Sequence, residues 1–354
     1  MKIYKIKITI VFLAITTLIS CNQGAKRKSM SDQDSPTKVT RDNFTIAETD
    51  KYFTEFASKH DINTIYHARK MSGKDNQFVI RENQDTYYSN ALVDISEGAT
   101  IINPYWDVYS SIQVIDENHY TIGVAYPGDT LEITKKDVAL GDHVYLNIRT
   151  GVRSLDSIGY AEAHKHQDSY SINANSSKNY ESKNFDSKSL DSLRSVLLSE
   201  AVNVRAWKAF GQKEEVEPND FLLASAAGWA GLPVKHATYV TNIQPTGAAL
   251  KGNCSQITIP KPPLQFDKGG FFSLTTYGPD GYITKDAFAL NNKQAMPNPD
   301  GSYTFHFNCE GRQNNIEVVE NWNLTIRLYM PNSLDEILAY VQSLHEEVQI
   351  TIVK

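Results

Sequence analysis

The chain has 354 residues, of which 41% are hydrophobic and 21% charged, and a formal net charge of -6. Its length suggests about two domains with sizeable cores, and its composition excludes a wholly disordered chain and, with three cysteines, a scaffold built from disulfides. The acidic balance gives no reason to expect nucleic acid as a partner.

The N-terminal segment 1–21 is typical of a secretory signal peptide. Lys2, Lys5 and Lys7 precede an apolar run over 8–19, and this run is shorter than the ~20 residues that a membrane-spanning helix needs. The stretch LISC that ends at Cys21 resembles the bacterial lipobox, which implies that lipid is attached to the Cys21 thiol. Acyl chains there would anchor the protein to a membrane of the cell envelope, with its body in the periplasm or at the cell surface. The alternative is simple secretion with an unmodified cysteine.

A flexible polar tether is expected over 22–43, because this stretch is charged and almost free of large aliphatic residues. An N-terminal β-rich domain is expected over 44–163, beginning with one amphipathic helix or two short ones over 44–69. Strands separated by turn residues are predicted at 78–80, 91–95, 100–102, 109–115, 120–124, 130–134 and 144–148. Short strands at this spacing predict a sandwich, a jelly roll or a barrel.

Residues 164–189 are rich in Ser, Asn and Lys, which predicts a polar surface loop of low complexity. A helical connector is expected over 190–238. Its first helix has an apolar face that continues from Leu190 to Phe210, with Gly211 suited to the position after the helix end. A second helix is predicted over 221–229.

A C-terminal β-rich domain is expected over 239–354, with strands at 254–259, 270–277, 303–309, 323–329 and 348–353. Ser333 and Glu336 form a capping box before a helix that ends near His345. The predicted fold class is therefore mainly β with helical connecting segments, in two β-sandwich or jelly-roll-like domains.

Several pieces of the chain carry a family resemblance through their order and spacing. In the first half they are Asn83, Asp85, Thr86, Tyr88, Ser89, Ala91, Val93 and Asp94, then Val114, Ile115, Asp116, His119 and Tyr120, then Arg149 and Thr150. In the second half they are AAGWAG at 226–231, GFFSL at 270–274, Tyr277, DGY at 280–282, LNN at 290–292, Asn298, DGS at 300–302, Trp322, Asn323, RLY at 327–329 and Pro331. Together they resemble a bacterial two-part family whose halves are known as domains of unknown function 1254 and 1214.

This resemblance implies β-sandwich or jelly-roll-like halves, frequent export and no settled biochemical activity. The chain departs from the family pattern at three places. Phe221 stands where a histidine is common, Phe272 replaces a tryptophan, and the tail from Ser333 lacks the usual G-x-W-x-x-P ending. These departures bear on any activity that needs the replaced groups.

Asp85 follows a turn-like stretch over 81–84 and precedes a strand. Its carboxylate could accept hydrogen bonds from nearby backbone N–H groups, as in an Asx turn. It could instead act as a general acid or base, or bind a ligand, in a pocket shared with Asn83, His119, Tyr120 and Arg149. A third alternative makes Arg149 the charge partner of a buried aspartate.

Three further groups of residues each allow two interpretations. His119, at a hairpin edge, is either a surface residue or a catalytic base. Trp207, Trp229 and Trp322 are either core residues or a stacking platform for a sugar. Arg327 either pairs with a neighbouring strand or binds an anionic ligand.

No metal ion and no cofactor are expected. His164 and His166 lie in a polar segment without the fixed further ligands of a metal site, and the common nucleotide, serine-hydrolase and zinc motifs are absent from the sequence. Once Cys21 carries lipid, Cys254 and Cys309 are the remaining thiols, and they could form a disulfide in an oxidising compartment.

Three functions fit these observations. The first is a lipid-anchored, extracytoplasmic module that binds a small polar ligand or saccharide at the junction of its domains. The second is a hydrolase or other acid/base enzyme that uses Asp85 with His119 or Arg149. The third is a structural envelope protein that forms homo-oligomers. For the first function, the expected binding residues are Asn83, Asp85, Tyr120, Trp229 and Arg327.

Overall fold

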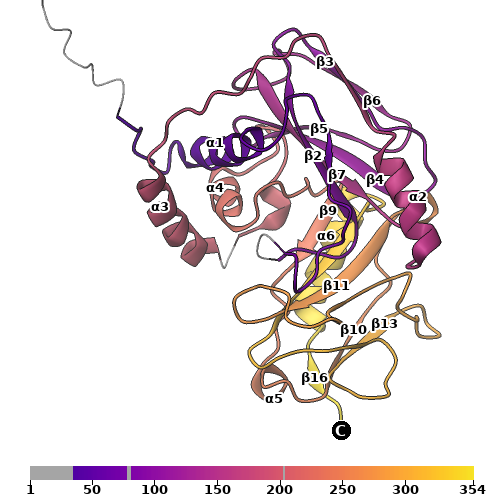
Figure 1. The fold of residues 1–354 in the computed structure, drawn as a ribbon. Helices are drawn as coiled ribbons and strands as arrows, with labels where there is room; N and C mark the ends of the chain where they lie inside the picture. Colours follow the sequence, from indigo (N-terminus) through magenta and orange to yellow (C-terminus); the bar gives the residue numbers. More distant parts are fainter. Residues whose placement is uncertain (1–34, 78–80, 202–203) are drawn as a thin grey trace, which may run out of the picture. The chain divides into compact units, whose positions relative to one another are not determined.

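The computed structural model describes residues 35–77, 81–201 and 204–354. The expected signal peptide, Cys21, most of the expected tether and the strand expected at 78–80 lie outside the described residues. Residues 37–354 form one compact unit, which contains two β-rich lobes (Figure 1). Among the described residues, no helix is both long enough and apolar enough to cross a membrane.

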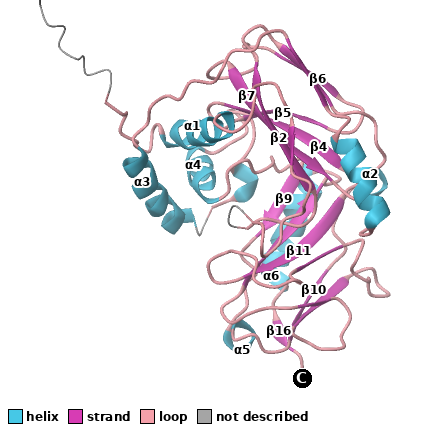
Figure 2. Cartoon of the chain, in the orientation of Figure 1, coloured by secondary structure: helices cyan, strands magenta, loops and turns pink. Residues whose placement is uncertain are grey.

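The described chain is mainly β, with sixteen strands in four sheets and six helices (Figure 2). The helices are α1 (Phe44–Ala57), α2 (Ser157–Gln167), α3 (Ser187–Glu200), α4 (Pro218–Ala227), α5 (Gly247–Leu250) and α6 (Leu334–Glu347), with 3-10 turns η3 (Ala206–Lys208) and η4 (Phe266–Lys268). The strands of the first lobe are β1 (Tyr66–His67), β2 (Tyr87–Asp94), β3 (Ala99–Ile102), β4 (Ser110–Asp116), β5 (Thr121–Ala125), β6 (Thr130–Ile133), β7 (His143–Thr150) and β8 (Ser171–Ala174). Those of the second are β9 (Ala237–Val240), β10 (Ser255–Ile259), β11 (Phe271–Tyr277), β12 (Ala289–Asn291), β13 (Tyr303–Phe307), β14 (Asn315–Ile316), β15 (Asn323–Tyr329) and β16 (Thr351–Ile352). This confirms the predicted fold class.

The N-terminal lobe is a sandwich of a five-stranded sheet, in the order β1-β2-β7-β4-β5, and a three-stranded sheet, β6-β3-β8. Alternate side chains of the five-stranded sheet, among them Val93, Val114 and Leu146, form the core with Ile101 of the smaller sheet. The intervening side chains point to the opposite face. That outer face carries Arg149 and other polar groups.

The C-terminal lobe is a second sandwich, made of the sheets β12-β11-β15-β9 and β14-β13-β10-β16. Its core combines Phe272 and Ile326 from the first sheet with Phe305 from the second and Ile337 from α6. The predicted capping box begins α6, where the Ser333 hydroxyl accepts a hydrogen bond from the Glu336 backbone N–H. A disulfide joins Cys254 and Cys309, whose Cα atoms are 4.8 Å apart.

The prediction of one long helix from Leu190 to Phe210 is wrong. The helix α3 ends at Glu200, and Trp207 lies half-buried in the separate turn η3. Asp220, on the first turn of α4, accepts hydrogen bonds from both the backbone N–H and the guanidinium of Arg205. These contacts hold the chain out of the helical path, so that Gly211 does not follow a helix end.

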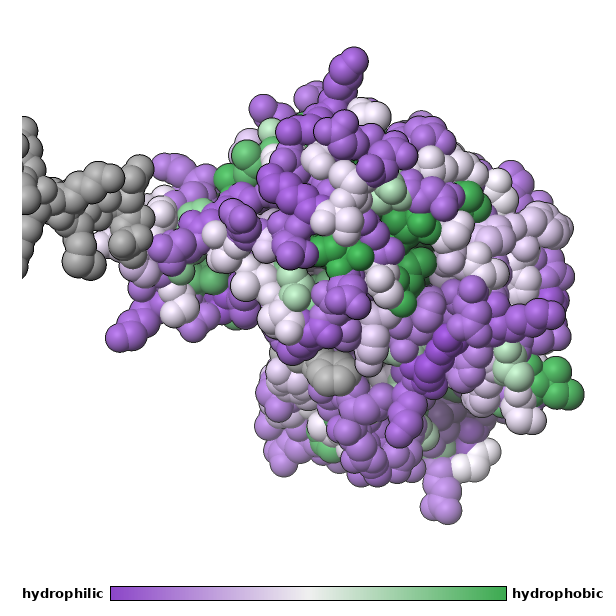
Figure 3. All heavy atoms as spheres, turned by 45° about the horizontal axis from the view of Figure 1, so that its top comes forward, coloured by the Kyte–Doolittle hydropathy of each residue, from purple (hydrophilic) through white to green (hydrophobic). Residues whose placement is uncertain are grey.

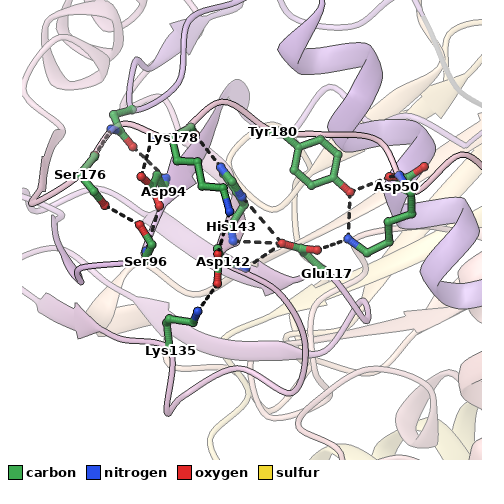
Figure 4. Close-up of polar contacts among 12 residues, drawn as sticks. Asp50, Asp94, Ser96, Glu117, Lys135, Asp142, His143, Ser176, Lys178 and Tyr180 are labelled. Carbon is green, nitrogen blue, oxygen red and sulfur yellow. Dashed lines mark hydrogen bonds and ion pairs between the residues drawn. The ribbon is translucent and has the colours of Figure 1, made fainter.

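The stretch 164–189 is not a loop throughout, contrary to its composition. It contains the end of α2, the strand β8, which pairs with β3, and the start of α3. Buried carboxylates from distant elements fix the intervening segment (Figure 4). Asp50 accepts hydrogen bonds from the Tyr180 hydroxyl at 2.7 Å and the Lys183 backbone at 2.9 Å, and Asp94 accepts one from the Lys178 backbone. The segment has few apolar residues, and for that reason its composition indicated a loop. Polar contacts hold it in place instead.

Candidate ligand site between two sheets

Two polar sheet faces meet between the lobes. Arg327 and Tyr329 of β15 point away from the C-terminal core, because Ile326 and Leu328 lie in it. They face the outer side of the five-stranded sheet, from which Arg149 projects. The faces are joined directly, since the Ser273 hydroxyl on β11 donates a hydrogen bond of 2.7 Å to the Asp85 carboxylate just before β2.

Asp85 is the centre of the first half of this junction, with a relative exposure of 6%. Its carboxylate accepts hydrogen bonds from Ser273 and, at 3.4 Å, from the Tyr329 hydroxyl. Burial raises the pKa of Asp85, although the charge of Arg327 and these two hydroxyls hold it down. The Asx-turn role considered for Asp85 belongs instead to Asn83, whose side-chain oxygen accepts a hydrogen bond from the Asp85 backbone N–H.

Arg327 is a buried guanidinium with several fixed partners. It donates to the Thr275 hydroxyl at 3.1 Å, to the Tyr277 hydroxyl at 2.8 Å and to the Arg81 carbonyl at 2.5 Å. The negative charge of the Asp85 carboxylate favours the charged form of this guanidinium. These contacts suit an arginine that joins the loop before β2 to the second lobe.

Arg149 has different surroundings. Its guanidinium donates to the Gln113 side-chain oxygen at 3.0 Å and to the Ala230 carbonyl at 3.1 Å, and lies 5.8 Å from the centre of the Tyr88 ring. Among the described residues, no carboxylate oxygen lies within ion-pair distance of it. The ion pair considered for Arg149 and a buried aspartate is therefore not formed. The arginine whose charge lowers the pKa of Asp85 is Arg327.

Four tyrosines surround Arg149 and favour the charged form of its guanidinium. They are Tyr88, Tyr109, Tyr239 and Tyr329. Two of them are buried, and burial raises the pKa of Tyr109 to about 12. Tyr88 and Tyr239 are half-buried. Phe271 stacks on Tyr329 with ring centres 4.3 Å apart, which gives the junction an aromatic wall.

His119, Tyr120 and Trp229 form a separate aromatic cluster. The His119 ring stacks on Trp229 and on Phe221, and Tyr120 stacks on the other side of the cluster against Phe221. The Ala230 backbone N–H donates to His119 Nε2 at 2.9 Å, while the Ala230 carbonyl accepts from Arg149. His119 is therefore next to the junction but separated from it by one peptide segment. Burial lowers the pKa of His119 to about 3, so its ring is neutral.

The remaining predicted residues lie elsewhere. Trp322 is buried in the C-terminal core and donates to the Ala249 carbonyl at 2.8 Å. His164 and His166 lie on the last turn of α2 rather than in a loop, with His166 stacked on Trp106. Two surface hollows, one lined by residues of 57–66 and one including Thr258 and Val348, hold none of the predicted site residues.

Sequence reasoning identified Asn83, Asp85, Arg149 and Arg327, which the fold brings to one junction. It did not identify the partners Tyr88, Tyr109, Tyr239, Ser273, Tyr277 and Tyr329 as site residues. The available signal was the alternation of polar with apolar residues along β11 and β15, which are buried along almost their whole length. A strand with both faces buried and one of them polar indicates a buried polar interface.

Comparison with known proteins gives a family for part of the chain and a fold for most of it. Residues 62–140 match the family described as "Protein of unknown function (DUF1254)", which confirms the resemblance for this N-terminal segment. The VPA0106 protein from Vibrio parahaemolyticus is 17% identical in sequence, with a TM-score of 0.67 over 88% of this chain and 97% of that one. A putative uncharacterized protein from Burkholderia cenocepacia is 12% identical over 82% of this chain and 84% of that one, with a TM-score of 0.46. No curated protein matches the chain.

Proposed function

We propose that this protein binds a small polar ligand, a saccharide or another small molecule, between the facing sheets of its two lobes. The observation that carries the proposal is the burial of Asp85, Arg149 and Arg327 at one junction, at exposures of 6%, 5% and 4%. An interface that served only to hold two lobes together would be more stable with apolar side chains, because burying charge costs free energy. Polar groups that converge from different elements are typical of binding sites.

We also propose that the protein is an exported lipoprotein anchored through Cys21, with a C-terminal half related to domain of unknown function 1214. The lipobox-like sequence and the motifs of the second half support this. The disulfide between Cys254 and Cys309 supports export, since such bonds persist in oxidising compartments.

An acid/base enzyme is the second candidate. It is favoured by the buried carboxyl of Asp85, whose pKa burial raises and which a hydroxyl contacts directly. Of the two partners considered, Arg149 shares the junction with Asp85, whereas His119 contacts the Ala230 backbone. Such an enzyme would use Asp85 as the proton carrier and Arg149 as the group that orients the substrate.

A structural, oligomerising protein is the third candidate. The face drawn in Figure 3 is mainly hydrophilic, with its apolar residues in small groups. The most exposed large apolar side chains, Tyr105, Ile158 and Met296, come from different parts of the fold. A self-association surface would need a larger contiguous apolar patch than this face presents.

Thermal unfolding of the full-length protein in non-ionic detergent, against a panel of sugars and organic acids, tests the proposal. A ligand bound only by the folded state must raise the unfolding midpoint. The rise should disappear in Asp85→Asn and persist in Asp61→Asn, the same change at an exposed position. A panel without any shift would support the structural alternative.

A further inference from the structure

We propose, building on the ligand site above, that the ligand is a small organic monoanion with an aromatic or apolar body, whose carboxylate binds to Arg149, Tyr88 and Tyr239. The residues of the junction present hydrogen-bond donors that have no negatively charged acceptor. This surplus identifies the class of the missing partner.

The hydroxyls of Tyr88 and Tyr239 are both acceptors in the structure. The Asn83 amide nitrogen donates to the Tyr88 hydroxyl at 3.0 Å. The orientation of this amide is fixed, because the Asn83 oxygen accepts a hydrogen bond from the Asp85 backbone N–H. The Leu232 backbone N–H donates to Tyr239 at 3.2 Å. Each hydroxyl therefore keeps its own hydrogen for a further acceptor.

Arg149 contributes the charge. Its two hydrogen bonds go to the neutral oxygens of Gln113 and Ala230, which leaves part of its donor capacity unused. Its charge is surrounded by tyrosines, whereas the charge of Arg327 is also attracted by the Asp85 carboxyl, although these two groups form no ion pair. A buried guanidinium favours a carboxylate with which it can form two parallel hydrogen bonds.

The donors around Arg149 select a monoanion. One guanidinium and two tyrosine hydroxyls match the two oxygens of a single carboxylate. A second negative charge, as on phosphate, would have no cation of its own among these groups, which is unfavourable in a buried site.

The aromatic residues beside Arg149 indicate the chemistry of the part of the ligand that is not the carboxylate. The Tyr88 ring lies 5.8 Å from the guanidinium, and beside it Tyr109, Tyr329 and Phe271 pack against one another. Such rings pack against aromatic or apolar groups. Tyr88 and Tyr239 are the half-buried members of the set, so a ligand would approach the junction from their side.

Differential scanning calorimetry of the full-length protein with benzoate as the probe tests this inference, with chloride at the same ionic strength as reference. The midpoint of the wild type should rise with benzoate and saturate. Arg149→Met should abolish the rise, and Arg312→Met, the same change at an exposed arginine, should leave it intact. Arg149→Lys, which keeps the charge but loses the paired geometry, should need at least tenfold more benzoate for half of the rise, and serves where the Met variant does not fold.

Each other outcome contradicts the inference. A benzoate effect that survives in Arg149→Met would place the anion elsewhere, and a larger effect of phosphate or of neutral benzyl alcohol would contradict the monoanion. A rise with glucose but none with benzoate would overturn this inference and leave the proposed ligand site standing. No rise with any probe would overturn both.

Discussion

Arg149 and Arg327 are both buried, but the groups that surround their charges differ. Arg327 donates to three neutral oxygens and is also attracted by the nearby carboxyl of Asp85. Arg149 is equally buried but has only neutral acceptors. A buried charge without a counter-ion destabilises a fold, and the free energy of ligand binding would offset this cost.

Replacing Asp85 by Asn is expected to leave the protein folded. Burial raises the pKa of Asp85, so folding favours the neutral carboxyl that Asn resembles. The stability that this group contributes is complete below the unfolded pKa of about 4 and is lost as the pH rises through the raised folded value. Urea unfolding should therefore give Asp85→Asn a free energy of unfolding within about 1 kcal/mol of the wild type at pH 7, or above it.

The pH dependence supplies the check on that prediction. Relative to Asp85→Asn, the wild type should lose stability as the pH rises from about 4. A strong loss of stability in Asp85→Asn at every pH would show that the ionised carboxylate is needed to hold Arg327.

His119 should make the protein sensitive to acid. Burial lowers its pKa to about 3, whereas an unfolded histidine titrates near 6.5. Its contribution is therefore complete above about pH 6.5 and is lost as the pH falls below that value, by on the order of a few kcal/mol. His119→Gln keeps an acceptor for the Ala230 N–H and does not titrate, so it should reduce the fall in unfolding midpoint between pH 7 and pH 5. The half-exposed His60→Gln is the matched control, and an equal reduction there would contradict the assignment.

At the scale of elements, Glu117 on the turn after β4 holds three segments together. Its carboxylate accepts hydrogen bonds from the backbone N–H groups of Asp142 and His143 at 2.9 and 3.1 Å and contacts the ammonium of Lys183 (Figure 4). Gly141 makes room for this contact, because a Cβ there would lie 2.0 Å from the carboxyl group. The positive φ of Gly141, 83°, independently favours glycine.

Gly141→Ala should therefore lower the free energy of unfolding by roughly 2–4 kcal/mol, through the left-handed backbone and the displaced carboxylate together. Gly301→Ala separates the two causes. Gly301 has nearly the same φ, 82°, but its Cβ would meet nothing within 4 Å, so a loss of only about 1 kcal/mol is expected. Equal losses in chemical unfolding would show that the contact with Glu117 does not matter.

The elements that could be predicted from the sequence are those with local patterns. The strand at 323–329 alternates polar with apolar residues, the strand at 91–95 is mainly aliphatic, and Ser333 with Glu336 marks the start of α6. The helix α2 was missed because its buried residues include Gly159, His166 and Gln167 rather than an apolar stripe. The segment between β8 and α3 is a loop, as predicted, but the sequence did not show that buried carboxylates far away in the chain hold it in place.

The site was predictable only in part for the same reason. Polar residues next to strands indicated Asp85 and Arg149. Their partners could not be read from the sequence, since Asp85 and Ser273 are 188 residues apart. The pairing depends on how two sheets face each other, which no local pattern encodes.

At the scale of the whole molecule, residues 37–354 form one compact unit, so we expect a single cooperative unfolding transition. The disulfide closes a loop of 55 residues between Cys254 and Cys309, which corresponds to about 4 kcal/mol of stabilisation from chain entropy. Replacing both cysteines by alanine should lower the calorimetric midpoint and make it insensitive to a reductant. A wild-type midpoint that a reductant does not change, with the thiols shown to be free, would contradict this.

The central claim is that a small molecule binds between the facing sheets. The most direct test is a crystal structure of the protein with the compound that raises its unfolding midpoint most. Density for that compound is expected between the sheets, with a polar group in hydrogen-bond contact with Arg149. A closed junction, in which Arg149 contacts only Gln113 and Ala230 while the compound lies elsewhere, would contradict it.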